Sequence, residues 1–141
     1  SRAEKEISQI LEEYPSIQAV IDLHRDGVNE NTHLVTEIDG KPMARFMFFN
    51  GLSRTKKNGP IDYLYNPYIE DNLALTLQLK LLCDQYYPGL SRNIYLKSLR
   101  YNLHLSDKAL LIEVGAQTNT LQEILNTMEP LSVLLAKVFG V

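Results

Sequence analysis

Hydrophobic positions recur along the chain with two periods, one typical of helices and the other of strands. In segment 1–14, Ile7, Ile10 and Leu11 lie at helical spacing, on one face of a predicted helix. Segments 17–23 and 109–114 are instead short apolar runs of strand length. Such runs predict strands with both faces buried, as in a sheet that helices cover on each side.

The segments between these runs carry the turn and capping residues that separate further elements. Asp39-Gly40 is a strong turn signal and predicts a hairpin with arms at 33–38 and 43–49. Asn66-Pro67 predicts a helix over 66–86, with Asn66 as its N-cap. A short strand is expected at 93–97. Thr120 and Glu123 form a capping-box pattern before a last helix, which Pro130 is expected to kink or restart.

The predicted order is helix, strand, hairpin, helix, strand, strand, helix. This order indicates an α/β fold, with a mixed, mostly parallel sheet and helices on both faces. The 141 residues suffice for one domain with a substantial core, so we expect a single domain over residues 1–141.

Composition excludes some classes of function. The net charge is −3 and no basic tract is present, so nucleic acid is not expected as a partner. No stretch approaches the roughly 20 apolar residues of a membrane span. The single cysteine, Cys83, lies in a leucine-rich helical segment and is expected to be a buried, inert thiol.

Candidate chemistry lies at the ends of the two apolar runs. His24, Arg25 and Asp26 follow the first run, and Glu113 lies near the end of the second. Because ligands bind beyond the carboxyl ends of strands in open α/β sheets, we expect His24 and Glu113 to meet at one edge. Asp22 shares a strand face with His24. It is either a partner that orients the imidazole or a solvated edge residue.

An imidazole and a carboxylate together suit metal-assisted hydrolysis. Imidazole nitrogen is a good zinc ligand, and a nearby carboxylate can take the proton of an attacking water. His24 would be the ligand and Glu113 the base. The same residues also fit a hydrogen-bonded structural role. His104, a few residues before the second run, is a third candidate that could contact the substrate or support the ligand.

Five blocks of sequence, in order over nearly the whole chain, resemble the stage II sporulation protein P family. They are V-I-D-L-H-R-D-G (20–27), A-R-F-M-F (44–48), N-L-A-L-T-L-Q-L (72–79), Y-P-G-L-S-R (87–92) and Y-N-L-H-L-S-D-K-A-L-L-I-E-V-G-A-Q-T-N-T-L-Q-E (101–123). The resemblance implies a zinc-dependent N-acetylmuramoyl-L-alanine amidase. Such an enzyme cuts the amide between muramic acid and the first alanine of the stem peptide, with added endopeptidase activity on cross-links.

The resemblance also implies a setting for this activity. The substrate would be peptidoglycan, and the enzyme would act during engulfment in spore formation. Its partners would be stage II sporulation proteins D and M. The full-length protein would be extracytoplasmic and membrane-anchored.

The resemblance assigns roles to two residues of this chain. His24 corresponds to the second histidine ligand of zinc, and Glu113 to the catalytic glutamate. Asp22, Arg25, Asp26 and His104 would support the ligand or contact the substrate. The family's first histidine and glutamate ligands are expected before Ser1, on a first strand that the chain lacks. These residues alone are therefore expected to bind zinc poorly, to cleave little peptidoglycan and to self-associate through the exposed sheet edge.

Two other hypotheses compete with a zinc amidase. One is a non-catalytic module of the same fold that binds the cell wall or a partner protein. The other is an α/β ligand-binding domain unrelated to metal. Hydrolysis of muropeptides separates the first alternative from the amidase, and metal analysis separates the second.

Overall fold

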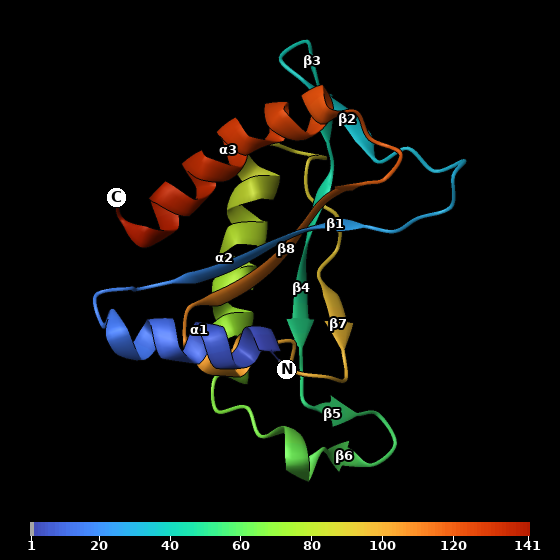
Figure 1. The fold of residues 1–141 in the computed structure, drawn as a ribbon. Coiled ribbons are helices and arrows are strands. Elements are labelled where there is room, and N and C mark those ends of the chain that lie inside the picture. The colour runs from blue at the N-terminus through green and yellow to red at the C-terminus, as the bar shows by residue number, and fades with distance from the viewer. Residues whose placement is uncertain (1) are drawn as a thin grey trace.

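The computed structural model describes residues 2–141, which form three α-helices, eight strands and two short 3₁₀ helices (Figure 1). In chain order these are α1 Arg2–Glu13, β1 Val20–Asp26, β2 Val35–Ile38, β3 Lys41–Ala44, β4 Phe46–Gly51, β5 Arg54–Thr55, β6 Gly59–Pro60, η1 Asp62–Leu64, α2 Ile69–Tyr86, β7 Tyr95–Lys97, η2 Leu103–Leu105, β8 Ala109–Ala116 and α3 Leu121–Phe139.

A four-stranded sheet with the order β1-β8-β4-β7 is the centre of the fold (Figure 1). β1 pairs with β8 in parallel, β4 pairs with β7 in parallel, and β4 and β8 are antiparallel. The α/β class and the mixed, mostly parallel sheet predicted from the sequence are confirmed. The hairpin β2–β3 and the ribbon β5–β6 are separate two-stranded sheets.

The main hydrophobic core lies between one face of the sheet and helices α2 and α3. Phe46 and Phe48 of β4 and Ile112 of β8 are fully buried against Leu79 of α2 and Leu134 of α3. All six residues of β4 are buried, as the sequence predicted for its aromatic run. Cys83 is also fully buried in this core, in agreement with the expected inert thiol.

The opposite face of the sheet is covered more thinly. Met47, Phe49 and Leu111 pack there with Leu103 of η2. Helix α1 buries no residue, and it is joined to this side of the molecule by Glu4, whose carboxylate lies 2.8 Å from Arg100 Nη2 and 2.9 Å from His104 Nε2. The expected capping box of α1 involves Ser1, which lies outside the described residues. No helix within residues 2–141 combines the length and the hydrophobicity needed to span a membrane.

The first strand differs from its prediction in both position and burial. It runs over Val20–Asp26 rather than 17–23, so His24, Arg25 and Asp26 are part of the strand rather than beyond its end. Ile21 and Leu23 are 44% and 53% exposed. The physical reason is topological: β1 is the edge strand of the sheet and has a neighbouring strand on one side only.

Two other predicted boundaries were also wrong. The second hairpin arm ends at Ala44, because the chain leaves the hairpin at Arg45 and enters the main sheet as β4. Helix α2 begins at Ile69, since the Asn66 side chain caps only a local turn, with Oδ1 accepting from Tyr68 N at 3.0 Å. Helix α3 continues past Pro130 as one element, Leu121–Phe139, so the helix does not restart at this proline.

The predicted capping box at the start of α3 is confirmed and is part of a larger network. The Thr120 hydroxyl accepts from Glu123 N, and the Glu123 carboxylate accepts from Thr120 N. The same carboxylate oxygen lies 2.9 Å from both His33 Nε2 and Asn119 Nδ2. Burial would raise the pKa of Glu123, but these hydrogen bonds outweigh burial, and the pKa is lowered from its ordinary value.

Replacing Glu123 should therefore weaken the fold at neutral pH and matter less in acid. A carboxyl with a lowered folded-state pKa stabilises the protein above its unfolded pKa, and this contribution disappears as pH falls through the folded value. For Glu123→Gln we expect a loss of about 1 kcal/mol in unfolding free energy at neutral pH, the typical value of a helix cap. The loss should shrink below about pH 4.

Urea unfolding across this pH range measures the effect. Glu129→Gln, on the exposed side of the same helix, is the matched control, because its carboxylate makes only a solvent-exposed pair with Lys41 at 3.6 Å. A Glu123→Gln loss that is constant with pH would contradict the assignment of the stabilisation to the charged carboxylate.

Candidate functional site

The parallel register of β1 and β8 brings the two main candidate residues side by side. His24 is directly opposite Glu113, and Asp22 is opposite Leu111. Opposite residues of paired strands project from the same face, and side chains on one strand repeat every two residues. Asp22, His24 and Asp26 therefore form a row on β1, on the same face as Glu113.

A bulge in β8 follows this pair. The register shifts so that Asp26 is opposite Ala116, and Gly115 lies in the extra stretch with φ +60°. A Cβ at position 115 would come within 2.7 Å of the Asn119 side-chain oxygen, which accepts from Ala116 N. Glycine thus satisfies both the backbone conformation and the close approach. Asp26 still lies close enough to Glu113 to raise its pKa.

The His24 imidazole is held by its neighbour on the same strand. His24 Nε2 lies 2.7 Å from Asp22 Oδ1. A proton on Nε2 makes this contact a hydrogen bond and leaves Nδ1 with a free lone pair, able to accept a proton or bind a metal ion. Arg25 lies on the opposite face of β1 from Asp22, His24 and Asp26. It forms no hydrogen bond or ion pair with the residues described.

Glu113 carries the most unusual electrostatics of the site. Its Oε2 atom is buried and has no hydrogen-bond partner within residues 2–141. The pKa of Glu113 is raised, first by burial and then by the neighbouring charge of Asp26, against opposing effects of His24 and Arg92. A buried polar atom without a partner is costly, so its presence beside an imidazole marks a place where a proton or a ligand can be accepted.

Arg92 completes the cluster from a distant part of the chain. Its Nη1 donates to Asp26 Oδ2 at 2.7 Å, and both side chains are largely buried. No pattern in the sequence had assigned a role to Arg92. It lies in the block 87–92 that supported the resemblance, but spacing along the chain does not place it near Asp26, 66 positions away.

His104 lies apart from His24 and Glu113. Its Nε2 is paired with Glu4 of α1, and burial lowers its pKa. His104 lies shortly before the start of β8 at Ala109, whereas Glu113 is four residues further, roughly 13 Å along the strand. The structure therefore groups His104 with α1 and Arg100, and no described contact joins it to His24 or Glu113.

Hydrogen bonds join the loops that follow β1 and β8, next to His24 and Glu113. The Gln117 side chain accepts from Val28 N at 2.9 Å and donates to Val28 O. Thr118 Oγ1 donates to Thr32 O at 2.6 Å, and Asn119 Nδ2 donates to Leu34 O at 3.0 Å. These bonds fix a polar rim at the carboxyl ends of the two parallel strands, where ligands bind in sheets of this type.

The described residues do not form a complete metal centre. Across residues 2–141, no three histidine, cysteine, aspartate or glutamate side chains come together in an arrangement that could hold a metal ion. A catalytic zinc site uses three protein ligands. His24 with its free lone pair and the unpaired oxygen of Glu113 are therefore at most part of such a site.

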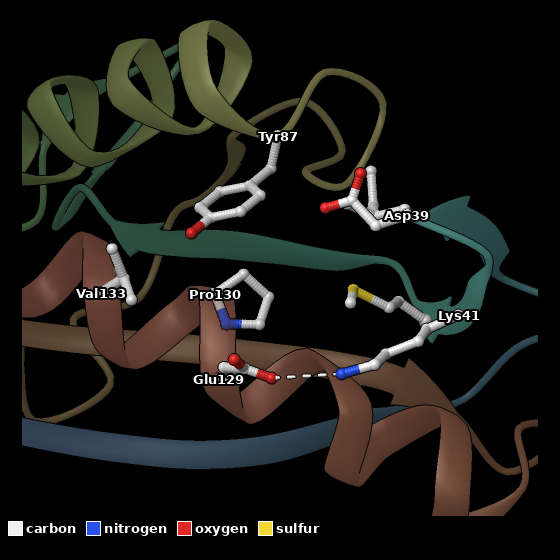
Figure 2. Close-up of a pocket in the computed structure, with 8 residues that line it drawn as sticks. Asp39, Lys41, Tyr87, Glu129, Pro130 and Val133 are labelled. Carbon is white, nitrogen blue, oxygen red and sulfur yellow. Dashed lines mark ion pairs between the residues drawn. The ribbon is translucent and has the colours of Figure 1, made fainter.

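A pocket on the opposite face of the molecule has a different character (Figure 2). Lys41 pairs with Glu129 at 3.6 Å at its rim, and Tyr87, Pro130 and Val133 form its walls. Its volume is about 160 Å³, below the roughly 300–1,000 Å³ of typical ligand pockets. It contains no histidine and lies on the side of the α2–α3 core, so the catalytic candidates are not part of it.

The fold and this site together define an α/β domain with a supported imidazole and a partly buried carboxylate near one edge of its sheet. The family model for stage II sporulation protein P matches residues 1–139, so the chain belongs to the stage II sporulation protein P family. Stage II sporulation protein P of Bacillus subtilis (strain 168) is 32% identical over 123 residues, which are 84% of this chain and 27% of that protein. The chain thus spans about a quarter of this relative's length. No solved structure shows a significant match. Family membership implies a role in sporulation.

The raised pKa of Glu113 leads to a stability prediction. A carboxyl whose folded-state pKa is raised destabilises the fold when it is ionised, and the protein gains stability as pH falls through that pKa. Glu113→Gln removes this charge, so its melting temperature at neutral pH should be equal to or above that of the unaltered protein. The stability gain on acidification should be reduced in the variant.

Thermal unfolding from pH 4 to pH 8 tests this, with Glu37→Gln on the exposed hairpin as a control for loss of a surface carboxylate. A clear fall in melting temperature for Glu113→Gln alone would show that the carboxylate stabilises the fold, contrary to the unpaired oxygen.

Proposed function

We propose that the protein is a peptidoglycan hydrolase that cleaves the amide between N-acetylmuramic acid and L-alanine, with Glu113 as its general base. The observation that carries this proposal is the buried, unpaired Oε2 of Glu113, directly beside His24 in the β1–β8 register. Family membership supports the same reaction class.

Glu113 is suited to accept a proton from an attacking water. Burial and the nearby Asp26 raise its pKa, which makes the carboxylate a stronger base than an exposed glutamate. The proton can then pass to the nitrogen of the leaving amine, which must be protonated when the amide bond breaks. Arg92, which pairs with Asp26 at 2.7 Å, opposes this rise in the pKa of Glu113.

His24 would provide one ligand of a zinc ion through Nδ1, with Asp22 orienting the ring through Nε2. When bound, zinc polarises the amide carbonyl and lowers the pKa of a coordinated water to about 7. The further ligands would come from a part of the longer protein outside these residues, in line with the incomplete set described above.

The setting is proposed on family resemblance. The enzyme would act on peptidoglycan outside the cytoplasm during engulfment, as part of a membrane-anchored protein. Stage II sporulation proteins D and M would be its partners, and cleavage of peptide cross-links would be a second activity on the same substrate.

The first test is turnover by the full-length protein. Glu113→Gln should lose roughly 100- to 10,000-fold in rate, the usual contribution of a general base. Release of stem peptide from purified sacculi measures it, and Glu37→Gln is again the control. Near-normal release by Glu113→Gln would exclude Glu113 as the base. Binding of sacculi without any release by the unaltered protein would instead favour a non-catalytic wall-binding module.

The second test is zinc content. His24→Ala in the full-length protein should lose most of its zinc, because a ligand is removed, whereas His104→Ala should retain zinc since His104 pairs with Glu4. Elemental analysis after dialysis against trace zinc distinguishes them. Equal loss in both variants would make His104 a ligand, and full retention by His24→Ala would remove His24 from the site.

A further inference from the structure

Beside Glu113 lies an open groove lined by Arg45, Met47, Arg92, Asn93, Ile94 and Tyr95. Its volume is about 330 Å³, within the roughly 300–1,000 Å³ range of ligand pockets. Met47 joins the two regions, because it lines the groove and is directly opposite Glu113 in the β4–β8 register. Arg92 joins them electrostatically, since its charge acts on the pKa of Glu113.

The groove carries excess positive charge in a chain whose net charge is −3. Asp26 pairs with Nη1 of Arg92, and the remaining N–H groups of that guanidinium have no partner within the described residues. Arg45 forms no ion pair anywhere in residues 2–141. One guanidinium charge at the groove is thus uncompensated.

Hydrogen bonds fix the backbone of Arg45 and one edge of its guanidinium. Its backbone is fixed by Arg45 N donating to Leu34 O at 2.8 Å and Gly115 N donating to Arg45 O at 2.9 Å. Its Nε donates to Gly89 O at 3.0 Å. These bonds fix the start of β4 and one edge of the guanidinium, and they leave both terminal amino groups available to an acceptor.

We propose that this groove is a subsite for a free carboxylate on the peptide part of the substrate, bound by Arg45 with Arg92 beside it. Guanidinium groups bind carboxylates through two parallel hydrogen bonds, which fixes both position and orientation. Tyr95 and Met47 give the apolar walls on which the adjoining peptide lies. This inference rests on the proposed function only for the identity of the substrate.

The test uses binding rather than turnover. Full-length protein carrying Glu113→Gln is titrated with a purified muropeptide, and with the same muropeptide after its carboxyl groups have been converted to amides. We expect about tenfold weaker binding of the amidated form, the scale of one charge-assisted hydrogen bond. Arg45→Gln in this background should bind both forms equally, and Arg45→Lys should retain part of the preference.

Arg54→Gln is the matched control, since Arg54 lies on the separate β5–β6 ribbon and should keep the full preference. If Arg45→Gln melts at a lower temperature, the affinities of native and amidated muropeptide for the Glu113→Gln protein with Arg45 intact still show whether a carboxylate is recognised. Equal affinity for the two forms, or an unchanged preference in Arg45→Gln, would overturn the subsite.

The outcome separates the two proposals. An Arg45-dependent preference without any sacculus cleavage by the unaltered protein would keep the subsite and reject the hydrolase. Glu113-dependent cleavage without a carboxylate preference would keep the hydrolase and reject the subsite.

Discussion

The parallel pairing of β1 with β8 is the constraint on which the site depends. β1 is an edge strand held by one neighbour, so this single ladder decides which of its residues face Glu113. A slip of one residue would turn His24 to the opposite face. The alternation of Asp22, His24 and Asp26 then matters more than their closeness in sequence, because only alternate positions of β1 lie on the same face as Glu113.

Negative and positive side chains oppose one another on this face of the sheet. Three carboxylates, Asp22, Asp26 and Glu113, lie near one imidazole and one guanidinium. Asp22 is satisfied by His24 and Asp26 by Arg92, so only Glu113 is left without a partner for one of its oxygens. Burial and the negative charge of Asp26 therefore act on the one carboxylate that no positive side chain contacts directly.

Local patterns in the sequence predicted much of this arrangement, and the failures have a common cause. The meeting of His24 and Glu113 could be predicted because each lies at or near the end of an apolar run with the length of a strand. The start of α3 could be predicted because its capping box is local. The exposure of β1 depends on strand order, and the approach of Arg92 to Asp26 depends on tertiary folding over 66 positions. Neither leaves a periodic signal in the sequence.

The loop between β1 and β2 is held mainly through its own backbone. Gln117, Thr118 and Asn119 reach across to main-chain groups of Val28, Thr32 and Leu34, so most of these bonds are indifferent to the loop's side chains. Asn29, Glu30 and Asn31 at its tip are exposed. Substitutions of Glu30 or Asn31 would therefore alter the groups presented beside the site while the loop keeps its shape, whereas the Asn29 side chain accepts from Asn31 N at 2.9 Å and supports the loop. A fixed frame with a variable lining is how one fold can present different chemical groups beside the same site.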